Sequence, residues 1–437
     1  MSEKAAQKGL GRWALVWCAT GQVIGAGVIS ITGAAVALTG RSAWLAYAVA
    51  VAIGLIRILP EIFFSSIMVL RGGKYGIVTR TLGKKWGGVM TLSNLLGWSA
   101  RGVAVLSMGQ YIHSVFPEVS VVMGGAISWT VIYIVNILGI NIMAGVQSLM
   151  TPLLLAALAM FSFFGFSHCT PDVFNFASPD FFTNGSSGFW AAVVLLCYST
   201  NGQAMISALS ERCENPKKDL PFAMIFATGI ILVVYCSVSF VAGGVLPVAE
   251  IAGQPLTPTA KLVLPPMLFV AFMIGGPIMA LATTMNSGIP NNAMPVVAGV
   301  EEGWMPPFLA KQNKNRTPYV AYTIIFIIGL IPILPGVSIG QITSFVILLS
   351  SFTNFLLIAC AYRMPTKFPQ EWKESHLHIN DVLYYALITL FALFQIYIVY
   401  KSVINLTRNM LIINILSFVF VFAYGYYRLK SGKVVMK

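Results

Sequence analysis

Three glycines interrupt the first long apolar run of the sequence: Gly21, Gly25 and Gly27. Each glycine weakens a helix by roughly 1 kcal/mol relative to alanine, so this cluster predicts a break. A break exposes N–H groups at the start of the following half-helix, and these groups suit a carboxylate. It also exposes carbonyl groups at the end of the preceding half-helix, and these suit an ammonium group or a cation.

A second interruption is polar and lies in the middle of the apolar run 188–210. It reads Tyr198-Ser199-Thr200-Asn201-Gly202-Gln203-Ala204. Inside a membrane such breaks persist only where they line a cavity. Close helix packing through small residues is the alternative for the first run taken alone. Two breaks that meet would offer donors and acceptors at the spacing of a free amino acid's carboxylate and ammonium.

The composition identifies the chain as an all-α polytopic membrane protein. Of its 437 residues, 57% are hydrophobic and 9% are charged, whereas soluble proteins have about 25% charged residues. Apolar runs recur that are long enough to cross ~30 Å of hydrocarbon. A β-barrel would show short alternating segments instead.

We predict twelve transmembrane helices, of which the last two are accessory. They lie near residues 12–38, 42–70, 87–115, 121–140, 143–168, 188–210, 221–246, 265–298, 317–336, 339–362, 381–401 and 409–428. Residues 1–428 would form one transmembrane domain, followed by a basic cytoplasmic tail at 429–437.

The net charge of +13 indicates orientation rather than nucleic-acid binding. Lysines and arginines gather in alternate short loops, and such loops face the cytoplasm. This asymmetry predicts that both termini are cytoplasmic. We expect the membrane to be the plasma membrane of a prokaryote.

The positions of the two breaks, in helices 1 and 6, suggest an internal repeat. Residues 12–168 would form the first five-helix copy, 188–362 a second, inverted copy, and 381–428 the accessory pair. Inverted repeats are the plan of many secondary transporters, whose sites lie between the discontinuous helices.

Four motifs in sequence order resemble those of the amino acid–polyamine–organocation transporters. They are Val23-Ile24-Gly25-Ala26-Gly27-Val28-Ile29, the segment Gly72-Gly73-Lys74-Tyr75-Gly76 with Arg80 and Gly83, the segment from Ser210 to Pro221, and Gly303-Trp304-Met305-Pro306-Pro307. Singly each motif is weak, but together they cover about residues 10–320.

The resemblance implies a transporter of amino acids or related amines, working by exchange or by ion or proton symport. It implies that the amides around Gly25, Ala26 and Gly27 hold the carboxylate. The carbonyls of Val23 and Asn201 would hold the ammonium, Tyr198 would close over the substrate, and Gly202 would permit the second break.

Two departures from the family bear on coupling and specificity. Many members carry a lysine in helix 5, where this chain has Thr151-Pro152-Leu153-Leu154, and some carry a glutamate in helix 6, where this chain has Ala204. Exchange therefore stays open, as does sodium coupling near Thr283, Thr284 and Ser287. A polyamine or organic-cation exchanger ranks second. Such a transporter would need acidic residues around its site, and Glu61 is the one acid in the middle of a predicted span.

Three charged residues fall within predicted spans. Arg57 and Glu61 lie four residues apart, and we expect an ion pair between them, with gating or coupling as the alternative. Arg101 has no acid nearby in sequence. It would either bind an anionic group of the substrate or serve structurally, by pairing with Glu61 or by capping broken-helix carbonyls. It slightly favours anionic or neutral substrates over cations.

Other functions find less support in the sequence. The six cysteines have no metal-ligand spacing, and His376 and His378 lack further ligands nearby. We therefore expect no metal site and no cofactor beyond a coupling sodium ion or proton. The sequence contains no set of residues typical of a catalytic site, so we do not expect an enzyme. A substrate-sensing receptor would normally carry an added signalling domain. The expected partners are a small amino acid or amine and membrane lipid, with a homodimer left open.

Overall fold

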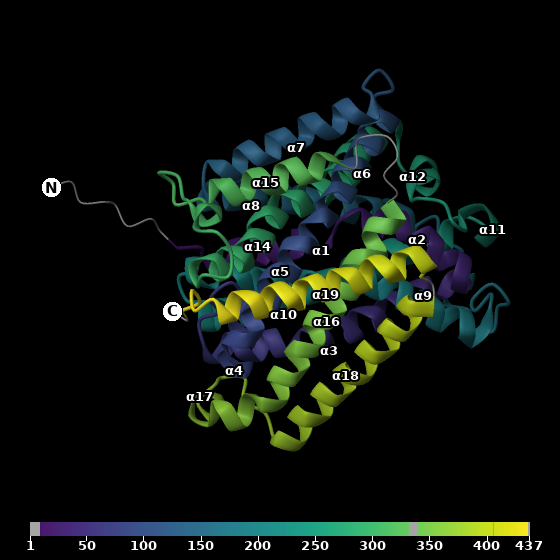
Figure 1. The fold of residues 1–437 in the computed structure, drawn as a ribbon. Coiled ribbons are helices and arrows are strands. Elements are labelled where there is room, and N and C mark those ends of the chain that lie inside the picture. The colour runs from purple at the N-terminus through teal and green to yellow at the C-terminus, as the bar shows by residue number, and fades with distance from the viewer. Residues whose placement is uncertain (1–8, 332–338, 405, 436–437) are drawn as a thin grey trace.

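The computed structural model describes residues 9–331, 339–404 and 406–435. Long helices run between two ends of the molecule (Figure 1). Those that correspond to predicted spans without a break are α3 (Ala43–Ile67), α7 (Val121–Ile137), α8 (Ile140–Phe166), α10 (Pro216–Val245), α15 (Tyr319–Leu330), α16 (Ile339–Lys367), α18 (Asp381–Ile404) and α19 (Arg408–Lys430). The first described residues and the end of α19 lie at the same end, which we call the terminal end.

The first predicted span is divided into two helices. Helix α1 (Arg12–Val23) ends before Ile24 and Gly25, and α2 (Ala26–Thr39) begins directly after them. The sixth is divided as well, because α9 (Gly185–Ser199) ends before Gly202 and the 3-10 helix η5 (Gln203–Arg212) follows. Gly202 has a φ of 143°, a conformation that side-chain-bearing residues rarely adopt.

Two further spans contain irregular helical turns, which we did not predict from the sequence. Helix α5 (Gly87–Leu96) passes into α6 (Arg101–Val115) through four residues of 3-10 helix. Helix α13 (Pro266–Met273) passes into α14 (Met279–Glu301) through a π-helical turn that contains Pro277. Proline cannot donate the usual backbone hydrogen bond, and π-helical turns often occur at functional sites.

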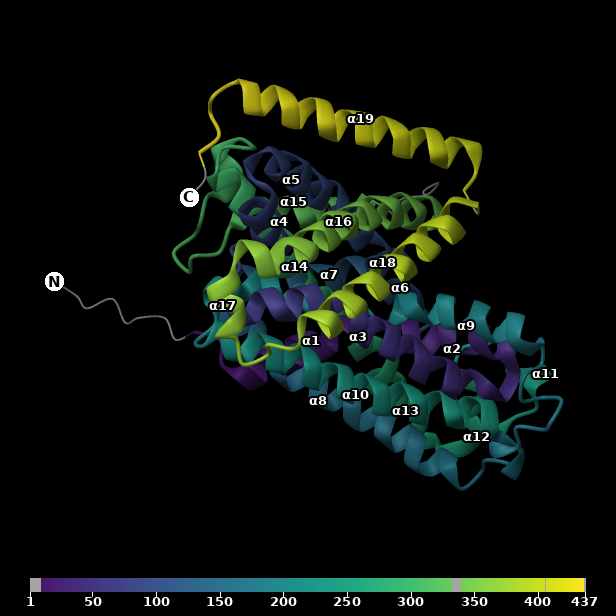
Figure 2. The ribbon, with the colours of Figure 1, turned by 90° about the horizontal axis from the view of Figure 1, so that it is seen from below.

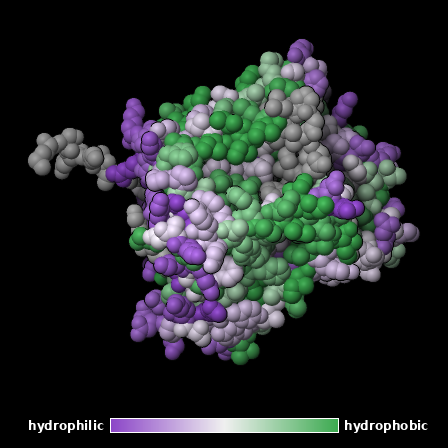
Figure 3. Space-filling model, viewed as in Figure 1, coloured by the Kyte–Doolittle hydropathy of each residue, from purple (hydrophilic) through white to green (hydrophobic). Residues whose placement is uncertain are grey.

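The surface is that of a protein that crosses a membrane several times. Among the described residues, seven helical stretches are long and apolar enough to span one. Figure 3 shows hydrophobic side chains over the middle of the molecule and hydrophilic ones toward its two ends. Part of the predicted span 317–336, namely residues 332–336, lies outside the described residues.

The short helices lie in the connections, at both ends of the long ones. Helices α4 (Lys74–Leu82) and α17 (Pro369–Lys373) lie at the terminal end, and α11 (Val248–Ile251) and α12 (Thr257–Val263) at the opposite end. None of these four was predicted from the sequence, because each is too short to show a clear period.

The last two helices lie on the periphery. Figure 2 shows α19 along the outside of the bundle. Within the most apolar 18-residue stretch of each helix, 22% of α18 and 17% of α19 is buried inside the protein, compared with 67% for the stretch 185–212. Their apolar side chains therefore face outward, whereas the interrupted helices form the centre.

Candidate substrate site between the interrupted helices

The two interruptions meet in the centre of the bundle. A Cβ atom built on Gly27 would lie 2.7 Å from the Cβ of Ser199, and one built on Gly202 would lie 3.3 Å from the carbonyl oxygen of Gln22. The first distance is too short for real carbon atoms. Glycine at position 27 therefore allows the start of α2 to touch the end of α9.

Tyr235 on α10 joins the two interruptions. Its buried hydroxyl group lies 3.0 Å from the carbonyl oxygen of Val23 and 3.2 Å from that of Ser199, within hydrogen-bonding distance of both. Its ring packs edge-on against Tyr47 at 5.1 Å. Sequence analysis missed Tyr235, and a tyrosine within an otherwise apolar run was the only available signal.

The first break presents groups of opposite polarity. The first N–H groups of an α-helix have no partner within that helix, and at α2 they belong to Ala26 and Gly27. The carbonyl oxygen of Val23, at the end of α1, accepts bonds from Tyr235 and, over 2.8 Å, from the N–H of Gly25. The N–H groups at the α2 start are of the polarity that suits a carboxylate, whereas an ammonium at the Val23 oxygen would have to displace the Tyr235 hydroxyl.

The predicted coupling residues of α14 lie against this break. Thr284 donates to the carbonyl of Gly21 over 3.1 Å, and its hydroxyl lies 3.0 Å from the carbonyl of Ala280. Thr283 donates to that Ala280 carbonyl over 2.9 Å, and Ser287 donates to the side-chain oxygen of Gln22 over 2.8 Å. Several neutral oxygen atoms thus converge, which is the donor set that hard cations prefer.

Buried neutral side chains link α14 to α7 and α8, and α8 to α1, by hydrogen bonds. Asn286 donates to the side-chain oxygen of Gln147 over 2.8 Å and accepts from Asn136 over 3.0 Å. Thr151 donates to the carbonyl of Trp17 on α1 over 3.1 Å. Sequence analysis passed over Gln147 and Asn136, whose partners lie more than a hundred residues away. Thr151 was noted there only because it lies where many family members have a lysine.

Arg101, at the start of α6, and Tyr198, near the end of α9, interact electrostatically. The Nε and Nη1 atoms of Arg101 are buried and have no hydrogen-bond partner among the described residues. Tyr198 is the ionisable side chain with which this guanidinium interacts electrostatically. The Tyr198 side chain is 62% exposed, so it does not cover the site in this structure.

The expected ion pair between Arg57 and Glu61 is not the one that the structure shows. Glu61 on α3 is instead bound by Lys74, with 3.1 Å between Oε1 and Nζ. Arg57 keeps a buried Nε atom without a hydrogen-bond partner in the described part of the chain. The prediction was wrong because Lys74, at the start of α4, reaches back to the end of α3 where Glu61 lies. Among the described residues, the charges that act on Glu61 are those of Lys74 and Arg57 and not that of Arg101.

Ion pairs fasten several elements together at the terminal end. Arg71 pairs with Glu301 at the end of α14 and lies 4.0 Å from Glu211 of η5. Burial alone would lower the pKa of the Arg71 guanidinium, but its hydrogen bond to Glu301 and the charge of Glu301 raise the pKa above its usual value. Arg12 of α1 pairs with Asp219 of α10 at 2.8 Å. These contacts join η5 to α14 and α1 to α10 at this end.

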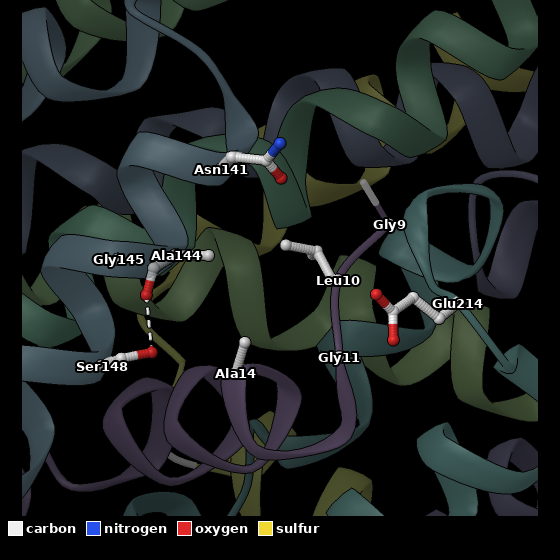
Figure 4. Close-up of a pocket in the computed structure, with 9 residues that line it drawn as sticks. All are labelled: Gly9, Leu10, Gly11, Ala14, Asn141, Ala144, Gly145, Ser148 and Glu214. Atoms are coloured by element: carbon white, nitrogen blue, oxygen red, sulfur yellow. Dashed lines mark hydrogen bonds between the residues drawn. The ribbon is translucent and has the colours of Figure 1, made fainter. Parts of the chain in front are cut away.

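Two hollows open at the terminal end. The larger, about 350 Å³, lies between the start of α1 and the start of α8 (Figure 4). It is lined by Gly9, Leu10, Gly11, Ala14, Asn141, Ala144, Gly145, Ser148 and Glu214. The smaller, about 50 Å³, is lined by residues of η5 and α14 and includes Glu211 and Glu301, both contacts of Arg71. Both hollows thus lie beside the elements that the ion pairs fasten.

Interrupted helices that meet inside an apolar bundle define the chain as a multi-pass helical membrane protein. A family model described as amino acid permease matches residues 10–423. The chain therefore belongs to the amino acid permease family, as the sequence motifs indicated.

Several curated relatives are similar to most of the chain. The branched-chain amino acid permease BcaP of Bacillus subtilis is 26% identical over 79% of this chain and 80% of its own length. The serine/threonine exchanger SteT of the same organism is 25% identical over 72% of this chain and 74% of its own. The probable threonine/serine transporter YbxG, also from Bacillus subtilis, is 23% identical over 79% and 76%. These relatives are transporters rather than enzymes.

Proposed function

We propose that the chain is a secondary active transporter that moves an amino acid across the plasma membrane by alternating access. The observation that carries this proposal is the meeting of the two interruptions, where Tyr235 lies within hydrogen-bonding distance of Val23 and Ser199. Half-helix ends that converge in a membrane offer fixed donors and acceptors without a fixed charge. Such a site suits a zwitterion, and membership of the amino acid permease family agrees with it.

In this proposal the substrate carboxylate binds the N–H groups that follow Gly25, at Ala26 and Gly27. The ammonium lies against the carbonyls of Val23 and Asn201, and it replaces the Tyr235 hydroxyl at Val23. The conformational freedom of Gly202 keeps the second interruption open.

The proposed topology has twelve spans, built as two inverted copies of five helices and an accessory pair. The interruption of one helix in each copy supports it. The first described residues and the end of α19 lie at one end of the molecule, which agrees with an even number of spans (Figure 1). The basic loops at that end would face the cytoplasm.

We propose that this structure is open toward the outside. The exposed side chain of Tyr198 would be the outer gate in its open position, and the ion pairs of Arg71 would hold the cytoplasmic end shut. Substrate binding would draw Tyr198 over the site. Release of the cytoplasmic ion pairs would then open the route along the hollows beside α1 and η5.

Exchange is the coupling that we favour, since the similar SteT protein is named as an exchanger. Sodium symport is the second candidate, because the oxygens of Gly21, Ala280 and Thr284 converge beside the break. Polyamine exchange has less support, because Glu61, the one acid well inside a predicted span, is already bound by Lys74.

Purified protein in proteoliposomes tests the proposal. We expect preloaded amino acid inside to accelerate uptake of labelled amino acid outside, and choline in place of sodium to leave the rate unchanged. A strict sodium requirement would instead support symport, with Thr284→Val as the variant that abolishes it. Uptake of polyamines but of no amino acid would overturn the proposal in favour of the runner-up.

A further inference from the structure

Arg101 carries a positive charge inside the bundle without a negative partner from the chain. Its Nε and Nη1 atoms are both buried and unbonded within the described residues. Glu61, the acid that the sequence offered as its partner, is held by Lys74. An unpaired charge at this depth is costly, so such residues usually mark a ligand pathway or site.

The polar groups bonded around Gly288, which the guanidinium touches, are uncharged. Asn292 of α14 uses its side-chain N–H to bond the carbonyl of Gly288 over 2.7 Å, and Trp98 donates to the carbonyl of Asn292 over 3.0 Å. Both groups are therefore committed to the backbone. The one ionisable side chain that interacts electrostatically with Arg101 among the described residues is the phenol of Tyr198, which is not a carboxylate.

Gly288 makes room for the guanidinium. A Cβ atom built there would lie only 2.3 Å from Nη1 of Arg101, so any side chain at this position would displace it. Gly288 lies four residues after Thr284 and therefore on the same face of α14, one turn away. A Cβ atom on Gly25 would lie 2.8 Å from the Thr284 hydroxyl, so Thr284 touches the first break.

These contacts place Arg101 beside the proposed substrate site. Gly288, which the guanidinium touches, lies about one helical turn, ~5.4 Å, along α14 from Thr284, which touches the first break. Tyr198, at the second interruption, interacts with the same guanidinium electrostatically. A ligand whose carboxylate binds at Ala26 and Gly27 therefore reaches Arg101 with its side chain.

We infer that Arg101 binds a second carboxylate, so that the transported substrate is an acidic amino acid. Arginine presents a planar fork of N–H groups that matches a carboxylate with two parallel hydrogen bonds. The N–H groups of α2 bind the carboxylate on the α-carbon, and Arg101 binds the one on the side chain. This inference rests on the proposed function and names its substrate class.

Matched pairs of ligands test the inference on the wild-type protein. Glutamate and glutamine differ little except in charge, as do aspartate and asparagine. We expect thermal stabilisation and inhibition of labelled glutamate exchange by one or both acids at concentrations roughly tenfold or more below those of the amides. If the amides act as well as the acids, Arg101 does not read a side-chain carboxylate and the inference is overturned.

Variants then locate the effect. Arg101→Gln should lose the preference for the acid while neutral amino acids still bind, and Arg101→Lys should recover part of it. Gly288→Ala, which displaces the guanidinium without removing it, should weaken acid binding in the same direction. Arg408→Gln, an exposed change on α19, serves as the matched control and should leave the preference intact.

The possible failures are distinguishable. An equal loss for acids and amides in Arg101→Gln would assign Arg101 to the α-carboxylate and overturn the inference, although the proposed transport would stand. If Arg101→Gln does not fold, the comparison of acids with amides on the wild-type protein and on Gly288→Ala still tests whether Arg101 binds a side-chain carboxylate. If no amino acid of either kind binds the wild-type protein, the proposed function itself fails.

Discussion

The hydroxyl group of Tyr235 lies 3.0 Å from the carbonyl oxygen of Val23, the last residue of α1. The same hydroxyl lies 3.2 Å from the carbonyl oxygen of Ser199, the last residue of α9. One side chain on an uninterrupted helix therefore holds the ends of both broken helices together. The proposed ammonium site lies where this hydroxyl now binds.

Tyr235→Phe should lower stability and change ligand binding at the same time. The variant keeps the ring against Tyr47 but removes the one hydroxyl donor that two buried carbonyl oxygens share, at a cost of about 1–2 kcal/mol. We expect a lower melting temperature without ligand and an altered apparent affinity for amino acids, both measured by thermal shift. Tyr384→Phe is the control, because its hydroxyl donates to Ala361 far from the site. Equal effects of both variants on affinity would remove Tyr235 from the site.

Gly27→Ala should separate the interrupted helices. The new Cβ would lie 2.7 Å from the Cβ of Ser199, so α2 and α9 must move apart. We expect amino acid exchange in proteoliposomes to fall at least about tenfold while the protein still folds, because local overpacking costs roughly 1–3 kcal/mol. The double variant Gly27→Ala with Ser199→Gly removes the clash and should recover part of the activity. Full activity of the single variant would mean that the close approach is not needed.

The sequence predicted the interruptions and most helix positions well, because glycine clusters and long apolar runs are local signals. It placed the first break between Thr20 and Ile29, and the structure has it at Ile24 and Gly25. The contacts that complete the site are not local. Tyr235 lies 212 residues from Val23, and Asn286 lies 139 residues from Gln147. No spacing rule in one sequence reveals such pairs.

The partner of Glu61 was predicted wrongly for a similar reason, because the true partner lies on a different helix. Spacing on one helix favoured Arg57, whereas a lysine from the next helix binds Glu61 in the folded chain. Helix α4, which carries that lysine, was predicted as a loop. A short helix beyond the end of a span changes which charges can meet, and its nine residues give too little periodicity to identify it.

Arg71→Gln should loosen the terminal end. It removes the ion pair with Glu301 beside the smaller hollow, and a partly buried pair of this kind stabilises the closed form by about 1 kcal/mol, or roughly fivefold. A cysteine introduced as Ala298→Cys, buried in that hollow, reports the change through its rate of maleimide labelling. We expect faster labelling in Arg71→Gln. The charge-swapped pair Arg71→Glu with Glu301→Arg should slow it again, whereas equal labelling rates in the parent protein and in both variants would exclude Arg71 as a gate.

Native Cys169 tests the orientation of the chain. It follows α8 at the end opposite to the termini, and burial raises its pKa to about 11, an effect that the charge of Arg41 partly offsets. Thiolate is the reactive form, so labelling of intact cells by a membrane-impermeant maleimide should be slow at pH 7 and accelerate roughly tenfold per pH unit toward pH 9. Glu250→Cys, exposed at the same end, should label readily at pH 7, and Cys169→Ser should remove the pH-dependent signal. If Glu250→Cys and Cys169 react only after the cells are permeabilised, both termini face outward and the proposed topology is inverted.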